Sequence, residues 1–194
     1  MVREINNKEG YEMKLAAIVG TNAEFSYNRI LLNFIKRYYA EEIEINVLEI
    51  KDLPLFNESE TETPQVISDL AKVIQEADGV IISTPEYDHG MTAALKSAIE
   101  WLSYNVHPFT GKPVMIVGVS LGKQGTDLAQ INIRQVLDAP GVDAFIMPGH
   151  QFLLSNAPDA FNEDGSSFPN TDTSIVNFHY DQDYSFTTHR IGAN

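Results

Sequence analysis

Cysteine is absent from the sequence, which excludes disulfide bonds, thiolate catalysis and cysteine-ligated metal centres. No apolar run approaches the ~20 residues that a membrane-spanning helix needs. The five histidines form no His-x-x-His or His-x-x-x-His pair, so a metal site has little support. Cations are also few. A total of 13 Lys and Arg against 27 Asp and Glu gives a net charge of −14, which argues against nucleic acid or an anionic membrane as a partner.

The length of 194 residues and the 43% apolar content are ordinary for one globular domain with a full core. Residues 1–13 are polar and charged and lack the apolar core of a signal peptide. We expect them to form a flexible leader, and we expect a cytoplasmic location. The domain itself is expected over residues 14–170. Residues 171–194 form a polar and aromatic tail for which a short helix or disorder is expected.

Five short apolar runs alternate with four amphipathic segments along the chain. Strands are expected at residues 14–19, 44–50, 80–83, 113–119 and 142–147, and helices at 26–39, 64–77, 90–104 and 127–137. This alternation predicts an α/β fold, a doubly wound, five-stranded parallel sheet with helices on both faces. Ligands of such sheets bind at the carboxyl ends of the strands. The loops after the first, third and fourth strands are therefore the candidate site.

The first of these loops begins at Gly20 and leads into a helical pattern near Ser26. A helix start has unpaired backbone N–H groups and a partial positive charge, both of which favour a phosphate group. Thr21, Ser26 and Asn28 add side-chain donors. An ordinary strand-to-helix turn, with Ser26 as the N-cap, explains the same residues without any ligand.

The other two loops cover residues 84–90 and 120–127. Pro85 ends the third strand, and Tyr87 and His89 offer flat faces against which a planar ring could lie. A plain turn with a solvated histidine is the alternative. In the second of these loops, two glycines permit close approach of the backbone to a ligand. Lys123 could lie near a developing negative charge, or it could simply be exposed, which is the commoner fate of a lysine.

Taken together, the three loops resemble those of the NAD(P)H-dependent FMN reductases. This family of the flavodoxin-like superfamily includes azoreductases, quinone reductases and chromate reductases. The resemblance covers about residues 14–166, and its most specific part is Pro-Glu-Tyr followed by Leu-Lys-x-Ala-Ile-x-Trp. The matching residues are Gly20, Thr21, Ser26 and Asn28 in the first motif, Pro85, Glu86, Tyr87, Leu95, Lys96, Ala98, Ile99 and Trp101 in the second, and Ser120, Gly122, Gly125, Ala129, Arg134 and Leu137 in the third.

The resemblance implies an oxidoreductase that passes two electrons from NADPH or NADH, through bound FMN, to a small acceptor such as a flavin, quinone, azo or nitro compound. It also implies a homodimer or homotetramer. Because the flavin supplies the chemistry, no protein group is expected as a catalytic acid or base. The implied cofactor-binding residues are Thr21, Asn22, Ser26, Tyr27 and Asn28 for the phosphate, Pro85, Glu86, Tyr87, Asp88 and His89 for the isoalloxazine ring, and Ser120, Gly122 and Lys123 for its other side.

The sequence departs from the family pattern at several positions. Ala23 stands where arginine is usual, which removes a cation suited to a phosphate. This predicts that the preference for NADPH over NADH is weak or that the dinucleotide is held differently. Asp88 replaces an asparagine, and its charge is predicted to lower the midpoint potential of the flavin. Thr92 replaces a proline. Trp101, by its helical spacing, is expected in the core or an interface rather than at the flavin.

Two other functions remain as alternatives from the sequence. A flavodoxin-like electron carrier without its own NAD(P)H oxidation would suit the net charge of −14, since acidic carriers dock on basic partners. Against a carrier, the first loop lacks the Thr-x-Thr-Gly-x-Thr pattern of flavodoxins. A flavin-free module of the receiver type would need an acidic cluster at the strand ends, and the sequence places none there.

Overall fold

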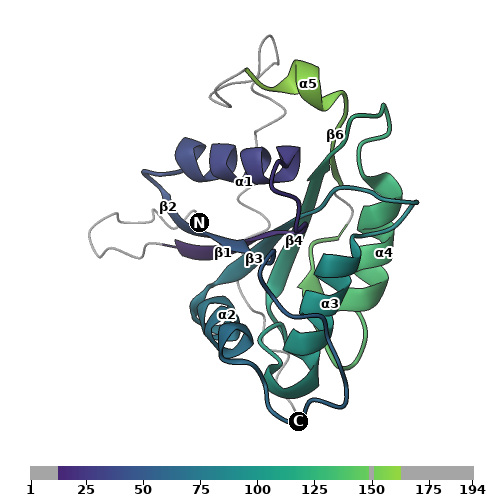
Figure 1. Ribbon diagram of the computed structural model, residues 1–194. Helices are drawn as coiled ribbons and strands as arrows, with labels where there is room; N and C mark the ends of the chain where they lie inside the picture. Colours follow the sequence, from purple (N-terminus) through teal and green to yellow (C-terminus); the bar gives the residue numbers. More distant parts are fainter. Residues whose placement is uncertain (1–12, 149–150, 163–194) are drawn as a thin grey trace.

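The computed structural model describes residues 13–148 and 151–162, which form a parallel sheet between two layers of helices (Figure 1). Its strands are β1 (Met13–Val19), β2 (Ile43–Glu49), β3 (Gly79–Ser83), β4 (Pro113–Val119), β5 (Phe145–Ile146) and β6 (Phe152–Leu154). They lie in the order β2-β1-β3-β4-β5, with β6 also paired to β4, and every pairing is parallel. The predicted doubly wound α/β fold is confirmed.

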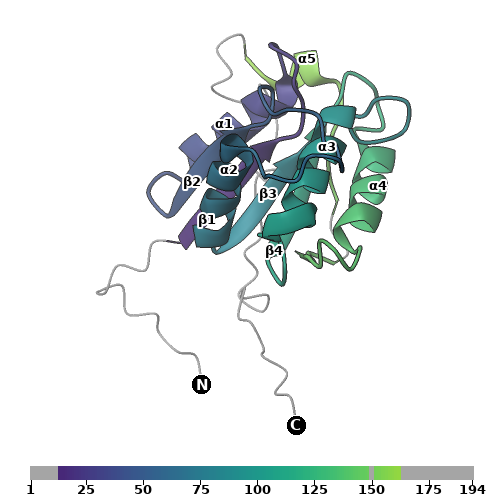
Figure 2. The same ribbon diagram turned by 60° about the horizontal axis from the view of Figure 1, so that its bottom comes forward.

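Each face of the sheet carries its own apolar core. The helices α2 (Gln65–Glu76), α3 (Ala93–Trp101) and α4 (Asp127–Leu137) cover one face, and α1 (Tyr27–Tyr38) and the short α5 (Ala157–Ala160) cover the other (Figures 1 and 2). Side chains of β1 alternate between the two cores, as a strand buried on both faces requires. Trp101 is 1% exposed and its indole N–H donates to Pro54 O at 2.9 Å, which confirms its core placement.

The edge of the sheet differs from the prediction. The expected fifth strand at residues 142–147 is wrong in extent, because only Phe145–Ile146 pairs with the start of β4. A second short strand, β6, pairs with the end of β4 at Val117–Val119. Pro148 follows the first segment, and a proline has no N–H with which to continue the ladder. The edge position is therefore shared by two strands, and β6 was not predicted.

The helix predicted at residues 90–104 also differs. It begins at Ala93 with Thr92 as its N-cap, and it ends in a π-helical turn, η1 (Leu102–Val106), which is followed by His107 at a φ of 46°. The predicted tail at residues 171–194 lies outside the described residues, as does the predicted leader apart from Met13, which begins β1. Over the described ranges, no helix combines the length and apolar character needed to cross a membrane.

Candidate functional site

Three loops meet at the carboxyl edge of the sheet, where β1, β3 and β4 lie side by side and end. They comprise residues 20–26, 84–92 and 120–126. A cavity of about 600 Å³ lies between them, a size typical of small-molecule sites. Its lining residues are Phe25, Ser26, Tyr27, Asn28, Pro85, Glu86, Tyr87, Val119, Ser120, Leu121, Gly122, Lys123, Gln124 and Gly125. The three loops singled out in the sequence thus surround one cavity.

The first loop leaves the sheet through a close backbone contact. Gly20 N donates to Ser83 O at 2.7 Å, and a Cβ atom at position 20 would lie 2.7 Å from the same oxygen. Glycine is therefore the residue that allows this approach of β1 to β3. Immediately after it, the buried Thr21 accepts a hydrogen bond from Ala23 N at 3.2 Å through its hydroxyl oxygen. The side chain of Thr21 therefore shapes the loop from inside.

The loop ends where α1 begins. Ser26 is the N-cap, with extended backbone (φ −153°), and its Oγ accepts from Arg29 N at 3.3 Å. The predicted N-cap is confirmed. In the described part of the chain, the backbone N–H groups of residues 24–28 donate to no protein acceptor, and four of these five residues line the cavity. A run of unpaired amides at a helix start is a ready-made anion site.

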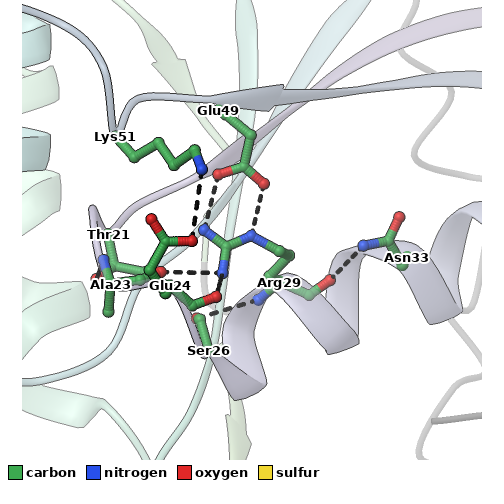
Figure 3. Close-up of polar contacts among 8 residues, drawn as sticks. All are labelled: Thr21, Ala23, Glu24, Ser26, Arg29, Asn33, Glu49 and Lys51. Atoms are coloured by element: carbon green, nitrogen blue, oxygen red, sulfur yellow. Dashed lines mark hydrogen bonds and ion pairs between the residues drawn. The ribbon is translucent and has the colours of Figure 1, made fainter. Parts of the chain in front are cut away.

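Arg29 ties this loop to the end of β2 (Figure 3). Its guanidinium group forms a bidentate pair with Glu49 at 2.6 and 2.8 Å, and its Nη1 donates to Ala23 O at 3.0 Å and Glu24 O at 2.8 Å. The hydrogen bond to Glu49 raises the pKa of Arg29 above its ordinary value, against the opposing effect of burial. Sequence reasoning missed Arg29, because its partners lie in another strand and in the preceding backbone.

Asn28 has a different environment from the other predicted phosphate ligands. Its side chain is 2% exposed. Its Oδ1 accepts from Ser83 Oγ at 2.9 Å and from Val119 N at 3.1 Å, while its Nδ2 donates to Val119 O at 2.9 Å. The amide group thus holds the start of α1 to the ends of β3 and β4. The backbone N–H of Asn28, rather than its carboxamide oxygen, is the group that faces no protein partner.

The middle loop contains a tight hairpin turn. Tyr87 and Gly90 exchange backbone hydrogen bonds at 3.1 and 3.0 Å, and Asp88 and His89 between them have φ values of 50° and 63°. Two positive φ values at the central positions define a type I′ turn, which favours Asn, Asp and Gly. The side chain of Glu86, just before the turn, is 15% exposed and its Oε2 accepts from Ala129 N at 3.0 Å. Glu86 therefore caps the first turn of α4 from a distant loop.

The third loop is held by β6 and by the N-cap residue of α5, two elements for which the sequence analysis predicted no strand or helix. Ser120 N donates to Leu154 O at 3.0 Å at the end of β6, and Asn156 N donates to Gly122 O at 3.1 Å. Gly125 has a φ of 64°, and a Cβ atom there would lie 2.9 Å from that of Leu153, so glycine suits this position on both counts. The side chain of Lys123 is exposed at the cavity.

The loops are also joined to one another. Thr92 Oγ1 donates to Gly20 O at 2.8 Å and accepts from Leu95 N at 3.0 Å, so one hydroxyl caps α3 and holds the first loop. The Glu86–Ala129 bond joins the middle loop to α4, which follows the third. The threonine that replaces the usual proline is thus a link between two walls of the cavity.

Most of the predicted site residues line the cavity, and four do not. Thr21 is buried in the first loop, and Asn22 is exposed in the same loop. Asp88 and His89 are exposed in the turn of the middle loop. The lining residues that sequence reasoning missed are Phe25, Val119, Leu121, Gln124 and Gly125. Phe25 and Leu121 could have been predicted from the sequence, since each is a large apolar residue within a polar loop. Among the described residues, no group of three acidic or histidine side chains is placed to hold a metal ion.

The sheet order and the cavity between the loops at its carboxyl edge define a flavodoxin-like α/β protein, and the free amides at the start of α1 face no protein acceptor among the described residues. The sequence profile of the NADPH-dependent FMN reductases matches residues 13–159. The chain therefore belongs to the NADPH-dependent FMN reductase family.

Individual relatives agree with this assignment. The chain is 48% identical over 154 residues to the NADH:(hydroxy)cinnamate reductase subunit CrdA of Vibrio ruber, which covers 79% of this chain and 76% of the relative. It is 45% identical over 155 residues to the NADH-dependent flavin reductase subunit 2 of Lactobacillus johnsonii, with 78% and 84% covered. The solved structure of FerB, a flavoenzyme NAD(P)H:(acceptor) oxidoreductase from Paracoccus denitrificans, superposes with a TM-score of 0.72 at 28% identity, covering 86% of this chain and 90% of FerB. The protein is an FMN-dependent NAD(P)H oxidoreductase.

Proposed function

We propose that the cavity between the three loops binds FMN with its phosphate against the first loop. The single observation that carries this proposal is the run of unpaired backbone N–H groups at residues 24–28, four of whose residues line the cavity. Ser26 and Tyr27 contribute amides at the first turn of α1, and Asn22 is exposed in the same loop. Thr21 and Asn28 act through the loop, because their side chains are engaged with Ala23, Ser83 and Val119.

The isoalloxazine ring is proposed to lie between the middle and third loops. Pro85, Glu86 and Tyr87 form one wall, with Asp88 and His89 in the turn beyond it, and Ser120, Gly122 and Lys123 form the other. When bound, FMN supplies the redox chemistry, accepting a hydride from NADH or NADPH and passing two electrons to an acceptor. The chain's own residues bind and orient the reactants and shield them from water, which requires no acid–base pair.

We propose that the acceptor is a flat aromatic molecule, a flavin, quinone, azo or nitro compound. The mouth of the cavity carries three large side chains that are unusually exposed, Phe25 at 68%, Tyr87 at 53% and Leu121 at 69%. Exposed apolar groups around a site are typical of surfaces that receive an apolar partner. The rim therefore favours a planar ring over a small hydrated anion.

The same rim supports a homo-oligomer, a dimer or tetramer, in which a second copy covers part of the cavity mouth. A chain with no partner would leave Phe25, Tyr87 and Leu121 in water. Light scattering on the purified protein tests this proposal, and a monomer would contradict it. Two relatives are named as subunits, so co-purification with a second gene product is the rival outcome. A cytoplasmic location is proposed with it, and cell fractionation tests that.

The first experiment is an absorbance spectrum of the purified protein with added FMN, followed by anaerobic NADH or NADPH. Flavin bands that bleach with either nucleotide are expected. Bands that persist would contradict NAD(P)H oxidation and favour the electron carrier, and no uptake of FMN would contradict the proposed FMN site in the cavity.

A second experiment tests the acceptor. Rates with a quinone, an azo dye and a nitroaromatic are compared with the rate for chromate, which has no ring. A Leu121→Ser variant is expected to lower kcat/KM for the ring acceptors and to leave chromate unchanged.

A further inference from the structure

The guanidinium group of Arg29 is bonded to two carbonyl oxygens of the first loop, yet Arg29 is not among the residues lining the cavity. Four of its five N–H donors are engaged, two by the carboxylate of Glu49 and two by the carbonyl oxygens of Ala23 and Glu24 (Figure 3). Its side chain is 19% exposed. Arg29 therefore has little capacity left for direct contact with a ligand in the cavity.

The two carbonyl contacts have a geometric consequence for the loop. Every peptide bond in the described chain is trans, and in a trans peptide the C=O and the following N–H point in opposite directions. The carbonyl of Ala23 shares its peptide unit with Glu24 N, and that of Glu24 shares its unit with Phe25 N. Because both carbonyls face Arg29, both N–H groups point away from it. Neither N–H has a protein acceptor in the described part of the chain.

Glu49 keeps the guanidinium group in this position. It is the last residue of β2, so its carboxylate is carried by the sheet and not by the loop. The bidentate pair fixes both the distance and the plane of the guanidinium group. A second, longer pair at 3.5 Å joins Lys51 to the side chain of Glu24. The loop is thus attached to the edge of the sheet through Arg29.

We propose that Arg29 is a positioning residue for FMN, which turns two peptide units of the first loop so that their amides face the phosphate, and thereby lets the enzyme prefer FMN over riboflavin. This inference rests on the proposed function, since it takes the first loop as the phosphate site. Arg29 acts through the backbone and makes no contact with the flavin ring. Its loss is therefore expected to weaken binding of the phosphate and to spare binding of the ring.

The test measures the dissociation constants of FMN and of riboflavin, which lacks the phosphate, by flavin fluorescence quenching with the flavin-free protein. Arg29→Met is expected to weaken FMN binding by about tenfold or more and to change riboflavin binding by less than about threefold. Arg29→Lys is expected to behave like Arg29→Met, because an ammonium group cannot reach two carbonyls and a carboxylate in a fixed plane. Lys36→Met, which removes an exposed cation from the end of the same helix, is the control and should match wild type.

Each contrary outcome overturns the proposal in a different way. An equal loss of affinity for FMN and for riboflavin in Arg29→Met would show that Arg29 has a general structural role. Full affinity for FMN in Arg29→Lys would show that the positive charge alone is sufficient. A loss of FMN affinity in Lys36→Met equal to that in Arg29→Met would show that positive charge on the helix acts on the phosphate through long-range electrostatics. Should Arg29→Met fail to fold, Glu49→Gln decides the matter, since an unchanged preference for FMN there contradicts the proposal. A wild-type protein that binds neither flavin, or binds both equally, overturns the proposed phosphate site, whereas a wild type that prefers FMN and an Arg29→Met variant that keeps this preference overturn this inference alone.

Discussion

Replacing Asn28 by alanine is expected to destabilise the protein by about 3 kcal/mol. The substitution removes three hydrogen bonds and leaves Val119 N–H, Val119 C=O and the hydroxyl of Ser83 without partners. A buried group that loses its partner costs ~1–3 kcal/mol. We take the low end for each of the three, because the cavity lies beside them and water can enter. The sum is a large part of the ~5–15 kcal/mol that holds a typical domain together.

Urea denaturation of the flavin-free protein measures this loss, and an unchanged m-value shows that the two-state comparison is valid. Ser83→Ala is the matched variant, because it removes one of the three bonds and is expected to cost about 1 kcal/mol. The double variant should cost less than the sum of the two, since the hydroxyl of Ser83 has already lost its partner in Asn28→Ala. A loss below about 1 kcal/mol in Asn28→Ala, combined with a large loss of FMN affinity, would refute the reasoning and make Asn28 a direct ligand.

Three further predictions concern the other loops. Glu86→Ala is expected to lower the free energy of unfolding by about 2 kcal/mol, because a charge-assisted bond to Ala129 N at the start of α4 is lost, and Glu86→Gln by about half as much. His89→Gly is expected to stabilise the protein by about 0.5 kcal/mol, since it creates the Asp-Gly pair that a type I′ turn prefers, while the entropy of glycine offsets part of the gain. Comparable kcat/KM values are expected for NADH and NADPH, because Ala23 leaves the loop without a cation free to bind a second phosphate.

Controls for these predictions come from the same chain. Glu76→Gln alters an exposed carboxylate on α2 and should leave the free energy of unfolding unchanged. An equally small effect of Glu86→Ala would contradict the role of Glu86 as a cap of α4. His107→Gly also relieves a positive φ, but it loses a 2.9 Å contact between the ring and the carbonyl oxygen of Gly141. His89→Gly loses only a longer contact, 3.5 Å from the exposed ring to Glu86, so His107→Gly should gain less. Greater stabilisation at His107 would contradict the turn argument. A preference of about 100-fold for NADPH would overturn the argument from Ala23.

Local patterns in the sequence were enough for most of the fold. The apolar runs and the helical spacing located β1, β4 and α4 within a residue of their bounds, and Ser26 was recognised as an N-cap from its position alone. These features depend on neighbours a few residues apart, which is why they can be read from one chain. The edge of the sheet was not predicted as well, because Phe152–Leu154 is too short to show a period.

The three site loops were determined by the sequence, and the way in which they are held was decided by the tertiary structure. Parallel strands end at one edge, so the loops after β1, β3 and β4 had to meet once the strand order was set. Asn28 and Val119 are 91 residues apart, and Glu86 and Ala129 are 43 apart. No spacing pattern in the sequence predicts such pairs, since they depend on which strands become neighbours in the sheet. The same side chains that resemble ligands in the sequence can therefore serve as the supports of the site.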